Sequence, residues 1–459
     1  MKKEKTSKRL TTQQVAEKLK KPYPTVALWV RQGRFPHAEY EETPRGGVWW
    51  IPESDLVGFV APKPGRPTKT HANKKTAQGR QKKLAKAEAE RFYNLVSAAH
   101  QKLMGAEQNA WLDRLDYEHE NLLATLDYYK RYNASKELEM AVGLGQFFYL
   151  HGYWSEGQER LQHAVERQPS GNSTLKAHGL AWIGYLSLRL DDYKLARQSL
   201  TESIQMSRPL GDQEYLAFSL HALGFVEEAE GNYIAAKSLF RESIQSGEAA
   251  KADWLVGEAF CGLGIIAEIE GDYAAAKEHY SQYLAKSEKI EDLRGIASAL
   301  NCLGAVAREQ GAYSEALRMH ERSLALRQGL RNKNGMAYCQ YDLGLLSEAT
   351  GQYAEACGSF QKSLALSQDT GNKLWMIRSL EAIGKMAQVT GAGEAAARVY
   401  GTADALRLSI SAPLSPAEQK NHGQIITAVK EQFSSAWQEG GQWPLDQAIA
   451  YALSLTTTT

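Results

Sequence analysis

Glycine recurs at one fixed interval from position 184 to position 384 of this 459-residue chain, and that spacing is the strongest constraint on its fold. A tyrosine follows the first five of these glycines by nine residues, and an alanine follows all six by twelve residues. Such a period indicates one structural unit that is repeated and stacked, because a single unit cannot bury its apolar face alone. The six glycines are Gly184, Gly224, Gly264, Gly304, Gly344 and Gly384.

Each period is predicted to be a helix, a tight turn and a second helix. The turns read EGNY, EGDY, QGAY and TGQY, and their glycines, such as Gly231, can adopt the left-handed conformation that ends a helix. The second helices, such as AAKSLFRESI, carry apolar residues at steps of three and four. The repeat glycine falls inside the first helix, where it costs about 1 kcal/mol relative to alanine. We expect close approach between stacked hairpins to compensate for that cost.

The phased glycine, tyrosine, alanine and following bulky residue resemble the tetratricopeptide repeat, in the 40-residue form found in bacterial regulators. The resemblance covers residues 137–410 and implies a superhelix of helical hairpins whose first helices line a concave groove. Residues 91–136 are expected to be N-terminal capping helices, and residues 411–459 C-terminal capping helices and a tail. Within that tail region, the sequence predicts a last helix from Pro444 to Leu453.

Three positions of each repeat, counted from its glycine, are expected to face the groove. They hold aromatic rings, an amide, carboxylates and one guanidinium, which could bind a peptide or a partner helix through stacking and hydrogen bonds. The alternative is that many of these side chains only pack one repeat against the next. The groove candidates are Tyr185, His221, Phe225, Glu228, Glu268, Asn301, Arg308, Tyr341 and Glu348.

Residues 1–60 have a different pattern. The segment LTTQQVAEKLKKPYPTVALWVRQGRFPHA resembles the helix-turn-helix of MerR-like and excisionase-like proteins. A first helix is expected to begin at Thr11 or Thr12, with Val15 and Leu19 facing inward. The following HAEYEETPRGGVWWIP predicts a β-hairpin wing with its turn at Arg45-Gly46-Gly47, and SDLVGFV predicts a helix capped by Ser54. The expected fold class is therefore all-α, with a small winged helix-turn-helix domain followed by a tetratricopeptide-repeat α-solenoid.

Double-stranded DNA is the expected partner of this N-terminal domain, because a short helix fits the major groove while neighbouring cations meet phosphates. The second helix carries fewer arginines than the family pattern, so specificity is expected to depend also on the wing and on DNA shape. Tyr23, Thr25 and Leu28 are expected to face bases. The expected phosphate contacts are Lys20, Lys21, Arg31, Arg34 and Arg45.

Residues 61–90 are rich in Pro, Lys and Arg and are expected to form a basic flexible linker. Their PGRP sequence, which contains Arg66, is similar to the minor-groove core of an AT-hook, with proline in place of the first arginine. The alternative is a solvated linker that adds only nonspecific attraction to phosphates.

The formal net charge of +1 hides two opposite parts. Residues 1–86 carry 20 Lys and Arg against 7 Asp and Glu, which gives +13, and the remaining residues carry −12. The basic end thus coincides with the helix-turn-helix pattern, which favours a polyanionic partner there.

The sequence disfavours several classes of protein. No apolar run approaches the about 18 residues of a membrane span, and polar residues follow the basic start where a secretion signal would be apolar. The four cysteines are far apart and no histidine has a partner at ligand spacing, so neither a metal, a cofactor nor an enzyme is expected. A cytoplasmic location is expected.

A second resemblance concerns the segments that flank the repeats. WLDRLDYEHENLLATLDYY and ARVYGTADALRLSISAPLSPAEQ are similar to the flanks of the repeats in STAND-type regulators of the LuxR and AfsR kind. This chain has no GxxxxGK[ST] motif, so the ATP switch of that family is not expected.

These features predict a bacterial transcription regulator in which a peptide, small ligand or protein in the repeat groove controls DNA occupancy. Two alternatives stay open: an adaptor or scaffold whose N-terminal domain contacts protein, and an excisionase-like accessory factor of a mobile element. A homodimer is a further expectation from the geometry of operator binding.

Overall fold

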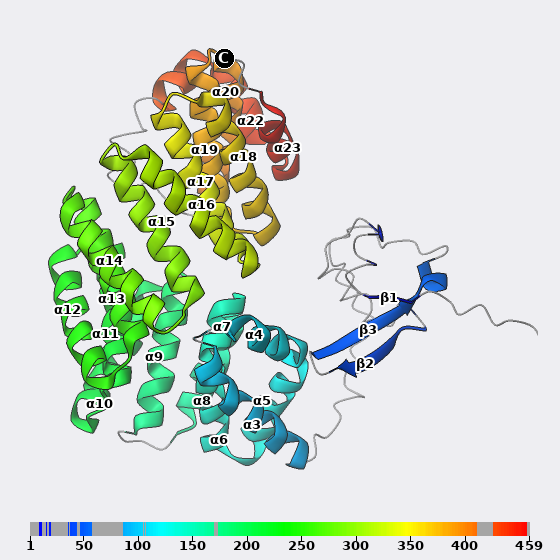
Figure 1. Cartoon of the computed structure of the whole chain (residues 1–459), viewed down its shortest axis with the longest axis vertical. Helices are drawn as coiled ribbons and strands as arrows, with labels where there is room; N and C mark the ends of the chain where they lie inside the picture. The colour runs from blue at the N-terminus through cyan, green and yellow to red at the C-terminus, as the bar shows by residue number, and fades with distance from the viewer. Residues whose placement is uncertain are drawn as a thin grey trace, which may run out of the picture. The chain divides into compact units, whose positions relative to one another are not determined.

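The protein is described from a computed structural model of the whole chain. It divides into two compact units, Met1–Lys83 and Leu84–Thr459, which have separate hydrophobic cores (Figure 1). The residues that the structure describes are 9–11, 15, 18–19, 35, 37–43, 46–56, 86–103, 105, 107–168, 173–410 and 426–456.

The first unit contains a three-stranded antiparallel sheet in the order β1-β3-β2. Strands β2 (Glu39–Thr43) and β3 (Gly46–Pro52) form the predicted wing hairpin, which is confirmed. Strand β1 (Arg9–Thr11) was not expected, and it pairs with the other edge of β3. Of the two residues at which the first helix was expected to begin, Thr11 ends strand β1 opposite Trp50, and Thr12 lies outside the described residues. This third strand satisfies backbone groups that a lone hairpin would leave unpaired along β3.

The core of this unit forms where the sheet meets the helical residues. Val15 is 0% exposed and clusters with Leu10, Phe35 and Ile51, while Leu19 packs against them, so the predicted inward faces of Val15 and Leu19 are confirmed. The Arg45-Gly46-Gly47 turn is shorter than predicted, because Gly46 and Gly47 already pair in β3 with β2.

A short 3-10 helix, η1 (Glu53–Leu56), follows β3. Ser54 lies inside it, so the prediction that Ser54 precedes the helix as its cap is wrong. The carboxylate of Asp55 accepts a hydrogen bond from the backbone N of His37 (2.9 Å) and lies 2.8 Å from His37 Nδ1. These contacts tie η1 to the start of the wing, and the rest of the predicted SDLVGFV helix lies outside the described residues.

The second unit begins with six helices that precede the regular hairpins. The first of them starts at Lys86, inside the range expected to be linker, because Phe92 and Val96 bury the inner face of that helix in the core. The six are α3 (Lys86–Lys102), α4 (Gln108–Tyr117), α5 (His119–Tyr132), α6 (Ala134–Gly143), α7 (Gly145–His151) and α8 (Trp154–Glu166).

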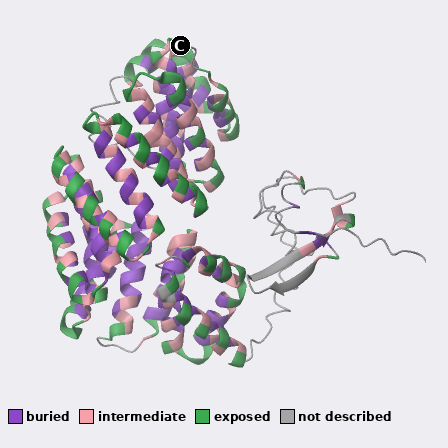
Figure 2. Cartoon of the chain, viewed as in Figure 1, coloured by how far each residue is buried: buried purple, intermediate pink, exposed green. Residues whose placement is uncertain are grey.

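Six helical hairpins follow, and in each of the first five the predicted tyrosine is the first residue of the second helix. In the first four hairpins the first helix buries more of its residues than the second (Figure 2). The hairpins are α9 (Thr174–Arg189) with α10 (Tyr193–Leu210), α11 (Gln213–Ala229) with α12 (Tyr233–Ala250), α13 (Asp253–Ile269) with α14 (Tyr273–Lys289), α15 (Leu293–Glu309) with α16 (Tyr313–Gly329), α17 (Lys333–Ala349) with α18 (Tyr353–Thr370), and α19 (Lys373–Val389) with α20 (Gly393–Ser409).

The repeat glycines allow close approach within a hairpin, not between stacked hairpins as predicted. A Cβ added at Gly224 would lie 2.6 Å from the Phe240 ring, and one at Gly264 would lie 2.4 Å from the Tyr280 ring. In both cases the ring belongs to the second helix of the same hairpin, sixteen residues after the glycine. The bulky residue of the pattern therefore fills the space that the glycine leaves open.

The helical residues 426–432 and the helices α22 (Ser434–Gln442) and α23 (Leu445–Ser454) pack beside the last hairpin. The last of them confirms the helix predicted from Pro444 to Leu453. A Cβ at Gly440 would lie 1.9 Å from the backbone O of Arg398, so α22 touches the backbone of α20 directly. Of the helices that the structure describes, none combines the length and apolar character that a membrane span requires.

Candidate functional site

The predicted DNA contacts cannot be placed. All nine lie outside the described residues: Lys20, Lys21, Tyr23, Thr25, Leu28, Arg31, Arg34, Arg45 and Arg66.

The aromatic groove candidates of the first two hairpins belong largely to the core. His221 is 0% exposed, so its prediction as an accessible groove residue is wrong, and its ring packs 5.5 Å from that of Phe225. Tyr185 is 3% exposed, and its ring centroid lies 5.2 Å from that of Phe218. Phe225 also packs against Phe240 at 5.0 Å. For these rings the structure supports the packing alternative, because large aromatic surfaces stabilise the stacked first helices.

His221 is buried with one ring nitrogen satisfied. Its Nδ1 lies 3.0 Å from the carbonyl O of Phe218 and donates to it, whereas its Nε2 has no partner among the described residues. Burial lowers the pKa of His221 to about 4, so the ring is neutral at pH 7.

The polar groove candidates lie half-buried in local networks. Asn301 Nδ2 donates to Asp342 (2.5 Å), and its Oδ1 lies 3.1 Å from His320 Nδ1. Arg308 pairs with Glu309 at 2.7 Å, and Glu348 forms an ion pair with Lys385. These contacts join neighbouring side chains of the solenoid and leave each group partly accessible.

Two of the predicted carboxylates have raised pKa values. Burial raises the pKa of Glu228, whose carboxylate has no hydrogen bond or ion pair within the described parts of the chain. Burial also raises the pKa of Glu268, although the hydroxyl of Tyr280 donates to it at 2.9 Å. Tyr341 lies 5.3 Å from both the Phe360 and Trp375 rings, and burial raises its pKa to about 12.

A cluster that sequence reasoning missed lies around Arg189, at the end of α9. Its guanidinium lies over two rings, with its carbon 5.3 Å from the centroid of Tyr149 and 5.1 Å from that of Tyr185. Arg189 Nη2 donates to the hydroxyl of Tyr185 at 3.1 Å. The Nε of Arg189 is buried and has no acceptor among the described residues.

Glu258, on α13, is a carboxylate whose charge acts on the pKa values of both Arg189 and Tyr185. Burial raises its pKa, while the hydroxyl of Tyr283, which donates to Oε1 at 2.8 Å, and the charge of Arg189 lower it. Glu258 and Arg189 are not within ion-pair distance of each other, and both side chains are half-buried. The charge of each group acts on the pKa of the other, although no ion pair joins them.

A sequence signal for Glu258 lies one helical turn before the first of the three groove positions that the sequence analysis counts from each repeat glycine. The residue six before the repeat glycine lies on the same helix face as the residue three before it. This position holds His178, Phe218, Glu258, Ser298, Tyr338 and Arg378. The residue type at this position changes from repeat to repeat, although the position keeps the same distance from the repeat glycine. Such variation is typical of a surface that contacts a partner and not the core of the repeats.

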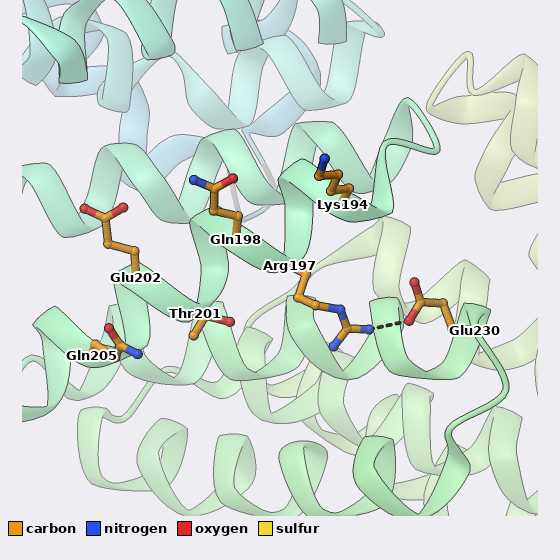
Figure 3. A pocket seen from close by; sticks show the side chains of 7 residues that line it. All are labelled: Lys194, Arg197, Gln198, Thr201, Glu202, Gln205 and Glu230. Atoms are coloured by element: carbon orange, nitrogen blue, oxygen red, sulfur yellow. Dashed lines mark hydrogen bonds and ion pairs between the residues drawn. The ribbon is translucent and has the colours of Figure 1, made fainter.

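A hollow beside the first two hairpins has a lining that does not include Arg189 or Glu258. About 750 Å³ in volume, it is lined by Lys194, Arg197, Gln198, Thr201, Glu202, Gln205 and Glu230 (Figure 3). Arg197 forms ion pairs with both Glu227 and Glu230. These ion pairs already neutralise the guanidinium of Arg197, and the other residues that line the hollow are polar and mostly exposed. The hollow is therefore a weaker candidate site than the Arg189 cluster.

In the described parts of the chain, no group of three His, Cys, Asp or Glu side chains could hold a metal ion.

Comparisons with known proteins agree with both parts of the fold. A helix-turn-helix domain model matches residues 9–63, and a tetratricopeptide repeat model matches residues 255–329 and 295–369. A search of the curated proteins finds no match. The chain therefore contains a helix-turn-helix domain and tetratricopeptide repeats, and the predicted fold class is confirmed.

Solved structures share the repeat fold at low sequence identity. The apo form of the quorum sensor NprR from B. thuringiensis is 15% identical, with 70% of this chain and 86% of that chain covered and a TM-score of 0.52. The Rap conjugation gene regulator of the plasmid pLS20, in complex with a Phr peptide, is 12% identical, with 71% and 96% covered and a TM-score of 0.50. These similarities concern the fold alone.

Proposed function

We propose that this protein is a DNA-binding regulator whose repeat solenoid binds a peptide that controls DNA occupancy. The observation that carries the proposal is the union of a winged helix-turn-helix with a solenoid whose Arg189 and Glu258 have no ion-pair partner among the described residues. Charges that are half-buried without such partners are costly to a protein alone. A ligand that neutralises them offsets that cost.

Three further observations support a peptide as the ligand. The Rap regulator, whose repeats have the same fold, holds a peptide. The polar groove candidates Asn301, Arg308 and Glu348 are only half-buried, and their side chains can form hydrogen bonds with an extended backbone. The solenoid and the helix-turn-helix are separate compact units, so one can respond to a ligand while the other meets DNA.

Selection of bound sequences from random double-stranded DNA by the full chain tests the proposal. We expect an enriched motif that Thr25→Ala weakens, with an affinity that falls steeply with salt. If about five phosphates are contacted, log affinity against log salt has a slope of about −4.5. A Lys194→Ala variant, on the outer face of α10, is the matched control. No enrichment and no salt dependence would instead favour the adaptor alternative.

The same proposal includes a cytoplasmic location and no enzymatic activity. The relationship to STAND-type regulators and the minor-groove role of Arg66 stay predictions.

A further inference from the structure

A second hollow lies before the regular hairpins, between α3 and α4. It is about 260 Å³ in volume, and one face of each helix contributes to its lining. Arg91, Leu95 and Ala98 are spaced by four and three residues on α3. Trp111 and Arg114 are spaced by three residues on α4. Side chains at these spacings share a helix face, so two facing helix surfaces form this α3–α4 hollow.

Part of the lining is apolar. Leu95 and Trp111 are half-buried, Ala98 is exposed, and the Phe92 ring behind them belongs to the core. The indole N–H of Trp111 donates to the carboxylate of Glu107 at 3.3 Å, so the polar atom of this ring already has a partner that does not line the hollow. The hollow therefore offers a ligand an apolar surface that includes an aromatic ring.

Two guanidiniums border this apolar surface without a carboxylate partner among the described residues. Arg91 and Arg114 are both exposed, and neither side chain forms an ion pair or a hydrogen bond within the described parts of the chain. In the hollow of Figure 3, by contrast, Glu227 and Glu230 already neutralise Arg197. The two cations of the α3–α4 hollow are therefore open to an anion.

Aromatic rings hold both guanidiniums in place. The central carbon of the Arg114 guanidinium lies 5.1 Å from the centroid of the Trp111 ring, and that of Arg91 lies 5.7 Å from the centroid of the Phe92 ring. A ring covers the face of a guanidinium, whereas the N–H donors lie in its plane and form paired hydrogen bonds with a carboxylate. The rings thus position the cations without using their donors.

Glu118 restricts the charge that a ligand can carry. It also lines the hollow, and its carboxylate accepts a hydrogen bond from Asn121 Nδ2 at 2.5 Å. No ion pair neutralises it within the described residues. Because like charges repel, a ligand with a second anionic group is disfavoured, and a neutral body suits the space beside the bound anion.

We propose that the α3–α4 hollow binds a small carboxylic acid with an aromatic body. Arg91 and Arg114 bind the carboxylate, and the aromatic body packs against Leu95, Ala98 and Trp111. The volume of about 260 Å³ suits a ring with a short side chain and is too small for a helix. This site goes beyond the proposed function, because its ligand is not the peptide of the repeat groove.

Calorimetric titration of the full chain with matched probes tests the site. Phenylpropanoate carries both groups, phenylpropanol lacks the charge, and propanoate lacks the ring. We expect saturable binding of phenylpropanoate and about tenfold weaker binding of phenylpropanol, which forms no charge-assisted hydrogen bonds. Propanoate should also bind about tenfold more weakly, because it buries no ring. Inorganic phosphate should not displace phenylpropanoate at equal concentration.

Matched variants assign the binding to this hollow. Arg114→Gln should remove most of the preference for phenylpropanoate over phenylpropanol. Ala98→Glu adds a carboxylate at an exposed lining position, whereas Ala98→Gln adds a similar volume without charge. We expect phenylpropanoate to bind the Ala98→Glu protein about tenfold more weakly than the Ala98→Gln protein, and phenylpropanol to bind both alike. Arg322→Gln, an exposed position on α16 whose guanidinium lies 3.8 Å from Glu288, should bind as the unaltered protein does.

The outcomes separate this inference from the proposed function. Equal affinities for phenylpropanoate and phenylpropanol, binding that Arg114→Gln leaves unchanged, or displacement by phosphate overturns the site. A capped Asp-Phe dipeptide that binds more tightly than phenylpropanoate also overturns it, because the hollow would then bind a protein partner. None of these results bears on DNA selection or on the repeat groove, since the hollow shares no residue with either.

Discussion

Arg294, in the first turn of α15, donates a hydrogen bond from Nε to Oε1 of Gln108 in α4 over 2.6 Å, although 186 residues separate them in the sequence. The neighbouring Asn109 donates to the carbonyl O of Gly329 at 3.4 Å, and Asp113 lies 3.5 Å from Arg331. The solenoid thus brings its fourth hairpin back to the helices that precede the repeats. Because these three contacts are polar and the last two are exposed, each contributes only a modest free energy to the contact between α4 and the fourth hairpin.

The first prediction concerns the hydrogen bond between Arg294 and Gln108, which a double-mutant cycle can test. Replacing Arg294 and Gln108 by alanine, singly and together, should give a coupling energy of about 1.5 kcal/mol, since a half-buried hydrogen bond to a charged group is worth that much. Urea unfolding measures it. The exposed pair Arg322 and Glu288, 3.8 Å apart, should couple by less than about 0.5 kcal/mol. Equal coupling energies in the two pairs would show that the hydrogen bond between Arg294 and Gln108 stabilises the protein no more than an exposed surface ion pair does.

The second prediction concerns pH and His221. Burial lowers its pKa from 6.5 to about 4, so the unfolded chain takes up a proton at a higher pH than the folded protein does. The stability that the neutral ring confers is complete above pH 6.5 and is lost as the pH falls toward 4. At about 1.4 kcal/mol for each pKa unit, the loss approaches about 3 kcal/mol.

Replacing His221 by phenylalanine removes this titration and keeps an aromatic ring among Phe218 and Phe225. Urea unfolding at pH 7.5 and pH 5 should therefore show the variant gaining stability relative to the unaltered protein as the pH falls. A difference between the two proteins that stays constant over this window would contradict the buried neutral ring.

The third prediction concerns the repeat glycines. Gly264→Ala places a Cβ 2.4 Å from the Tyr280 ring, and overpacking of this kind costs about 1–3 kcal/mol. Gly358, inside α18, has nothing within 4 Å of the added Cβ, so Gly358→Ala should stabilise by up to about 1 kcal/mol. Thermal unfolding of both variants gives the comparison. A Gly264→Ala protein as stable as the Gly358→Ala protein would mean that the glycine is not needed for the close approach.

The fourth prediction concerns the third hairpin, where Gly257 and Tyr283 replace the alanine and the serine of other hairpins. Changing Gly257→Ala alone should destabilise the protein, because the new Cβ meets the Tyr283 ring. Adding Tyr283→Ser restores the residues of the other hairpins, and its hydroxyl can again donate to the carbonyl of residue 257. We expect the double variant to recover stability in urea unfolding, because the serine hydroxyl can donate to the backbone as it does in the other hairpins. A double variant that stays as unstable as Gly257→Ala would show that the two positions are not coupled.

Much of the fold follows from local pattern. The fixed glycine period, the tyrosine at the start of each second helix and the turn glycines predict the hairpins because helix periodicity and helix ends depend on residues close in sequence. The wing hairpin was predicted for the same reason. Strand β1 was missed because its partner, β3, lies far along the chain, and Arg9–Thr11 carries no strand pattern of its own.

The groove was predicted only in part. His221 and Tyr185 lie at the expected positions of their helices, yet residues of adjacent helices bury them. The periodicity of one helix does not show which of its residues a neighbouring helix will bury. Arg189 was missed because it stands one residue beyond the positions considered, and the Tyr149 ring beneath it comes from α7, before the regular hairpins.

The sequence by itself determined that this chain is a basic helix-turn-helix domain joined to an acidic stack of helical hairpins, since charge and period are properties of the chain alone. Only the tertiary structure decided which inner-face side chains remain accessible and which charges stay unpaired. Arg189 and Glu258 are far apart in the sequence, and only the folded solenoid places them so that the charge of each acts on the pKa of the other.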